Sequence, residues 1–234
     1  MDIFSSEGVS FYLLRWIHFL AGITWIGILY YFNFIQGAFF AETDAQTKNN
    51  ATSQLVPRAL WWFRWGAMFT FLSGLTMIIG LYHMYGGEYL DGARFGLILV
   101  GATMGTLMFL NVWVVIWPAQ KVVIASTNAV LGGGQADPQA AGRARRAFLA
   151  SRTNTLFSAP MLFFMGAAHL QHVLAHPGAV GLVVIIALIL IIEVNALAGT
   201  DGPLKKPIEK PRALIISSFV LTAILVGMYC GFAG

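Results

Sequence analysis

Long uninterrupted apolar runs are the feature that most constrains this sequence. Each run approaches the roughly 20 residues that an α-helix needs to cross the hydrocarbon core of a bilayer. A transmembrane β-barrel would instead need short strands of alternating polarity. Charged residues make up only 10% of the chain, against about 25% in soluble domains. The sequence therefore predicts an all-α fold, a polytopic bundle of transmembrane helices that forms one integral membrane domain over residues 1–234.

About six spans are predicted, with ends placed to within several residues. They run over about Val9 to Phe34, Leu60 to Tyr85, Phe95 to Trp117, Leu156 to Leu174, Ala179 to Leu197 and Ala213 to Phe232. All but two of the fourteen Lys and Arg residues fall in or beside the first, third and fifth connections. The positive-inside rule then predicts both termini outside and a basic cytoplasmic loop at 118–152. We interpret the net charge of +4 as an orientation signal, not as a sign of nucleic-acid binding.

Histidines in membrane spans are costly and therefore invite a functional explanation. All five are predicted to lie in the outer half of the bundle: His18, His83, His169, His172 and His176. His18 and His169 are the deeper pair and come from different spans, so we predict that they bind the iron of haem b. His83 and His172 are further candidates for the same site. The two remaining cations, Arg15 and Arg94, lie on the same side and are predicted to pair with the haem propionates.

Other interpretations of these residues stay open. His169, His172 and His83 form an alternative site for copper or zinc. Each histidine alone is also compatible with an ordinary hydrogen-bonded packing role. Three polar residues in the spans have two possible roles, proton or substrate handling or interhelical hydrogen bonding: Asn111, Glu193 and Asn195. The small residues of Gly101-x-x-x-Gly105, with Gly96 before them, predict close packing of the third span against a neighbouring helix.

Three stretches resemble the N-terminal membrane domain of bacterial membrane-bound urate hydroxylase, the cytochrome c-linked urate oxidase. They are Arg15-Trp16-Ile17-His18 with Trp25-Ile26-Gly27, Asn111-Val112-Trp113 through Trp117-Pro118-Ala119-Gln120-Lys121, and Arg152-Thr153-Asn154-Thr155 with Ser158-Ala159-Pro160 and His169. The likeness extends from about residue 9 to 175. It implies a multi-pass oxidoreductase of the bacterial inner membrane that hydroxylates urate and passes electrons to cytochrome c. The opening helix also resembles, more weakly, copper-resistance and haem-pathway membrane proteins.

The sequence departs from that family's pattern in one respect. The family's membrane part is typically joined to a cytochrome c domain, whereas this sequence has one cysteine, Cys230, and no Cys-x-x-Cys-His motif. The sequence thus predicts a haem-b-binding oxidoreductase or electron-transfer subunit that reduces a separate periplasmic cytochrome c. The alternative hypothesis is a non-catalytic accessory subunit of a larger energy-transducing membrane complex.

Overall fold

The computed structural model describes residues 6–170, 175–199 and 201–233, and within these ranges every regular element is helical. The elements are α1 (Ser6–Tyr30), η1 (Tyr31–Gln36), α2 (Gly37–Glu42), α3 (Ala45–Gln54), α4 (Val56–Tyr85), α5 (Gly87–Asp91), α6 (Ala93–Leu110), η2 (Asn111–Ile116), α7 (Trp117–Leu131), α8 (Ala140–Ala167), α9 (Gly178–Leu197), η3 (Pro203–Lys205), α10 (Lys206–Glu209) and α11 (Pro211–Ala233). The predicted all-α class is confirmed.

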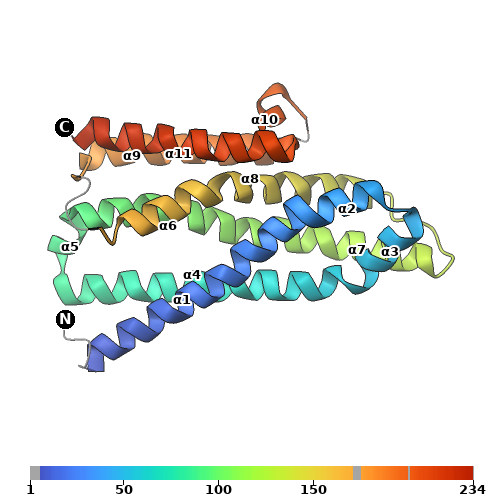
Figure 1. Ribbon diagram of the computed structural model, residues 1–234, viewed down its shortest axis with the longest axis horizontal. Coiled ribbons are helices and arrows are strands. Elements are labelled where there is room, and N and C mark those ends of the chain that lie inside the picture. Colours follow the sequence, from blue (N-terminus) through green and yellow to red (C-terminus); the bar gives the residue numbers. More distant parts are fainter. Residues whose placement is uncertain (1–5, 171–174, 200, 234) are drawn as a thin grey trace.

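The long helices lie along one bundle axis (Figure 1). α1 crosses α4 and packs against it, while α6 packs against α8. α9 and α11 lie side by side, and α11 covers α8 from the side opposite α4. The buried core is apolar and joins all of these helices, with fully enclosed side chains such as Trp25, Phe63, Phe157 and Tyr229. α8 therefore lies in the middle of the bundle.

Five helical stretches in the described residues are long and apolar enough to cross a membrane: 8–42, 56–85, 93–131, 178–197 and 211–233. The predicted fourth span, 156–174, overlaps α8, which is not one of the five, and its last four residues lie outside the described residues. α8 differs because the bundle surrounds it, so that it carries a buried polar run, Arg152 to Thr155, which lipid would disfavour. The count of six spans stays a prediction.

Two of these stretches are much longer than a membrane requires. At 1.5 Å per residue, the 39 residues from Ala93 to Leu131 extend over about 58 Å, against a hydrocarbon core of about 30 Å. Most of the loop predicted at 118–152 is therefore helical: α7 continues the third span, α8 begins at Ala140, and only residues 132–139 connect them. This end of the bundle is extended by α3, whose Ser53 hydroxyl donates a hydrogen bond to Asn128 of α7.

The basic connections come together at the end of the bundle opposite to the described ends of the chain (Figure 1). α3, the start of α8 and α10 all lie there, and the Arg145 guanidinium contacts carboxylate oxygens of Glu209 at 2.7 Å and Asp201 at 3.5 Å. The grouping of the cations on one side, which the sequence implies, is thus present in the fold. Its assignment to the cytoplasm stays a prediction.

Candidate functional site

His18 lies on α1 and faces α4, where Ser73 holds its ring. The His18 Nδ1 atom is 3.2 Å from the Ser73 hydroxyl oxygen. That hydroxyl donates its own proton to the carbonyl oxygen of Phe69, at 2.6 Å, so it accepts a hydrogen bond from His18 Nδ1–H. With its proton on Nδ1, the neutral ring would have its lone pair on Nε2. The His18 ring also hydrogen-bonds to the backbone of Thr70, so two residues of α4 hold it.

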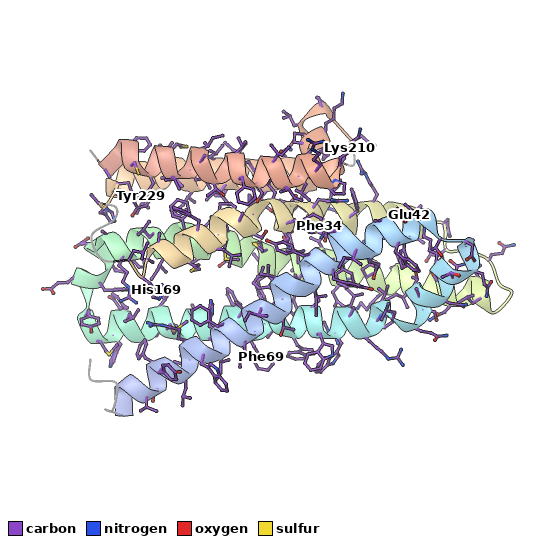
Figure 2. The ribbon with its side chains drawn as sticks, viewed as in Figure 1. Phe34, Glu42, Phe69, His169, Lys210 and Tyr229 are labelled. Atoms are coloured by element: carbon purple, nitrogen blue, oxygen red, sulfur yellow. The ribbon has the colours of Figure 1, made fainter. Side chains whose placement is uncertain are left out.

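His169 lies just after α8, and its Nδ1 also has a hydrogen-bond partner, which here is a backbone carbonyl instead of a hydroxyl. Its Nδ1 atom is 2.9 Å from the carbonyl oxygen of Met165, which only accepts, so Nδ1 again carries the proton. Figure 2 shows His169 at the end of the bundle, next to the end of α8. A histidine whose Nδ1–H is fixed by a carbonyl or hydroxyl is oriented for metal ligation through Nε2.

The two histidines and the two outer arginines are electrostatic neighbours. A charge on His169 acts on His18, and the guanidinium groups of Arg15 and Arg94 both act on His169. These groups come from α1, α6 and the end of α8, elements that are far apart in sequence. His169 is thus the electrostatic neighbour that the other three residues share, and their role as one site stays a prediction. We refer to them as the outer cluster: Arg15, His18, Arg94 and His169.

The other three histidines are placed differently. His83 is exposed in the last turn of α4. His176 is half-buried, and its Nδ1 accepts a hydrogen bond from the Gly178 amide at 3.0 Å, which fixes the turn into α9. His172 lies outside the described residues. His176 therefore has the packing role that was the alternative interpretation for each histidine.

The donor chemistry of the outer cluster suits haem iron. A neutral imidazole is a good ligand for haem iron, and the His18 ring packs directly on α4: a Cβ atom at Gly74 would lie 3.0 Å from His18 Cε1. For copper or zinc, the described residues hold no group of three or more His, Cys, Asp or Glu side chains that could bind a metal ion. The alternative site also requires His172, which stays untested.

A second polar group lies inside the bundle around α8. Asn154 is fully buried; its amide donates to the carbonyl oxygen of Met108 at 3.0 Å, and its oxygen accepts from Asn111 at 2.9 Å. Asn111 is also hydrogen-bonded to the Glu193 carboxyl group, whose Oε2 atom is buried without a partner. Asn111 therefore makes the interhelical hydrogen bonds that the sequence analysis offered as one interpretation, while Asn195 is only half-buried and forms none that is described.

Both π-helical segments place a buried asparagine against α8. Asn33 lies in η1 and donates to the Ser151 hydroxyl at 2.8 Å, and Asn111 opens η2 and donates to Asn154. A π turn inserts one residue into a helix and rotates the following face, and such turns are frequent at functional sites. The sequence analysis did not detect these insertions, because apolar composition continues through them without a change.

Replacing Asn154 by leucine should lower the free energy of unfolding by about 3 kcal/mol. The substitution leaves the Met108 carbonyl and an Asn111 N–H buried without partners, and each such group costs about 1 to 3 kcal/mol. Unfolding of the purified protein in mixed micelles by increasing dodecyl sulfate measures the change. Asn195→Leu is the matched control and should shift the free energy by less than about 0.5 kcal/mol. Equal effects of the two substitutions would contradict the network.

The described residues form an all-helical bundle in which five helical stretches are long and apolar enough to cross a membrane, and in which His18 and His169 are electrostatic neighbours. Comparison with known families adds that residues 90–198 match the model described as urate oxidase N-terminal. No curated protein and no solved structure matches the chain significantly. The stretch from α6 to α9 is therefore similar to a urate oxidase N-terminal domain. It contains Arg94, His169, Asn111, Asn154 and Glu193, whereas Arg15 and His18 precede it.

Proposed function

We propose that this protein is a haem-b-binding membrane oxidoreductase or electron-transfer subunit, related to urate hydroxylase. The observation that carries the proposal is that His18 and His169 each have Nδ1 at hydrogen-bond distance from an oxygen of the protein, an arrangement that would leave Nε2 as the ligand atom. Two neutral imidazoles from separate helices are a common ligand set for haem in helical bundles. Bound haem would supply one-electron transfer at this site.

The residues of the outer cluster have separate tasks in this proposal. Ser73 and the Met165 carbonyl orient the two rings and raise the basicity of their Nε2 atoms by accepting the Nδ1 protons. Arg15 and Arg94 supply positive charge beside His169 and would pair with the haem carboxylates. Half-burial of His18 against α4 keeps its ring in one orientation.

The substrate and the acceptor are proposed from the family. Similarity of residues 90–198 to a urate oxidase N-terminal domain supports urate as the electron donor. The proposed electron acceptor is a periplasmic cytochrome c, the acceptor implied by the resemblance to cytochrome c-linked urate hydroxylase. The apolar helices would lie in the lipid bilayer of a bacterial inner membrane.

Optical spectroscopy of the purified protein tests the proposal. We expect reduced-minus-oxidised spectra with Soret and alpha bands of b-type haem, and reduction of the same bands when urate is added without oxygen. Mixing with oxidised cytochrome c should then reverse the change. Absence of haem bands would refute haem binding. Haem bands that dithionite reduces and urate does not would exclude urate and favour the accessory-subunit hypothesis.

A further inference from the structure

Arg152 is a buried cation with no anionic partner among the described residues. Its side chain is 5% exposed, and its Nε and Nη1 atoms are enclosed without any hydrogen bond. The ion pairs of Arg145 with Glu209 and with Asp201 do not involve Arg152. Buried charges in proteins are normally paired, because leaving water costs a charge much of its solvation. An unpaired guanidinium inside the bundle therefore points to a ligand.

The comparison with Arg145 sharpens this point, because both arginines contact the same ring. The Phe148 ring lies 4.8 Å from the Arg152 guanidinium carbon and 5.5 Å from that of Arg145. Arg145 is neutralised by Glu209 and Asp201. Arg152 contacts the Phe148 ring and has no carboxylate partner among the described residues. A cation–π contact is weaker than the solvation that burial removes. Phe148 therefore orients Arg152 without neutralising it.

The position of Arg152 shows where its partner would bind. Residues 145, 148 and 152 follow one another at intervals of three and four, so they share a face of α8. Arg145 on that face reaches Glu209 of α10, and one turn beyond Arg152 the Leu156 carbonyl accepts a hydrogen bond from Ser218 of α11. The face thus looks toward α10 and α11. Lys205, just before α10, adds a second buried cation, whose ammonium donates to the Ala198 carbonyl among the described residues.

We propose that Arg152 binds an oxyanion of phosphate type at the junction of α8, α10 and α11. The planar guanidinium offers parallel N–H donors that match two oxygens of such a group. The group can reach this end of the bundle as free phosphate or as the headgroup of an acidic lipid. This inference does not depend on haem or on urate, because His169 lies 17 residues further along the chain, about 25 Å away at 1.5 Å per helical residue.

Thermal unfolding in nanodiscs tests the site in two arms. In the first, the discs contain phosphatidylcholine only, and inorganic phosphate is added against chloride at equal ionic strength. In the second, phosphatidylglycerol replaces part of the lipid and no phosphate is added. A ligand at one hundred times its Kd should raise the melting temperature of the wild type by about 5 to 10 °C in one arm. The responding arm identifies free phosphate or lipid as the source.

Arg152→Gln should lose that shift, and affinity should weaken about tenfold or more. Arg146→Gln removes the same charge from an exposed position of α8 and should keep the full shift. Arg152→Lys should keep part of the shift, because lysine retains the positive charge but lacks the parallel N–H donors of the guanidinium. A wild type that shifts in neither arm, or an equal shift in wild type and in both Arg152 variants, overturns the proposal. If Arg152→Gln does not fold, the melting-temperature shifts of the wild type and of Arg152→Lys are compared instead, and equal shifts overturn the proposal.

Discussion

Replacing His18 or His169 by alanine should lower the haem content of the purified protein at least about tenfold. Removing the partner that orients a metal-binding histidine commonly costs 10- to 100-fold in metal affinity, and loss of the histidine itself costs no less. Both substitutions should therefore remove the Soret band, although the two residues come from different helices. The pyridine haemochrome assay on protein of equal concentration measures the haem content.

His176→Ala is the matched control for these variants. It removes an imidazole near the same end of the bundle, but one whose Nδ1 accepts a hydrogen bond from the Gly178 amide, so that the neutral ring carries its proton on Nε2 and has no lone pair there for iron. Haem content should stay within about twofold of wild type. If His176→Ala loses haem while His18→Ala retains it, the ligand assignment is wrong.

Ser73→Ala separates orientation of the ring from ligation. Without the hydroxyl, His18 Nδ1–H loses its acceptor, and haem affinity should fall about tenfold while haem of ordinary spectrum remains. Thr76→Ala removes a hydroxyl from the exposed face of the same helix, where it bonds only to the Leu72 carbonyl, and should leave the affinity unchanged. Equal affinities in the two variants would show that Ser73 does not position His18.

The sequence was sufficient to predict the helical class and to select the residues of the outer cluster as candidates, whose role as a site stays a prediction. Both follow from composition, since apolar runs and isolated ionisable residues inside them are visible without a fold. The sequence was not sufficient to predict the partners of Asn111 or the unpaired state of Arg152. Those depend on how far each helix is rotated about its axis, and the π turns at Tyr31–Gln36 and Asn111–Ile116 change that rotation locally.

Glycine spacing shows the same limit. Gly101 packs against α8 as predicted, since a Cβ atom there would lie 3.2 Å from Met165 Cγ, but Gly105 has nothing within 4 Å. Two backbones approach each other closely at Gly66, which has no glycine three or four residues away and therefore forms no Gly-x-x-x-Gly motif. Small-residue motifs identify a face of one helix, whereas a close contact also requires the matching surface of the other.

Gly66→Leu should destabilise the protein by about 3 kcal/mol or more. A Cβ atom at Gly66 would lie 3.1 Å from the Trp25 amide nitrogen, 3.2 Å from the Ala21 carbonyl oxygen and 3.3 Å from Trp25 Cα. These are backbone atoms of α1 and cannot turn aside, so the two helices must move apart. Overpacking of this kind typically costs about 1 to 3 kcal/mol, and a leucine adds three further carbons to the clash.

The matched control is Gly27→Leu, because Gly27 is an exposed residue of α1 and a Cβ atom there would have nothing within 4 Å. It should leave stability unchanged or raise it by up to about 1 kcal/mol through better helix propensity. Unfolding by dodecyl sulfate in mixed micelles measures both variants. Separation of α1 from α4 also moves His18 away from Ser73, so Gly66→Leu should lower haem affinity as well, whereas Gly27→Leu should not. A Gly66→Leu protein with wild-type stability would mean that α1 and α4 do not meet at this crossing, and the position of His18 would have to be assigned anew.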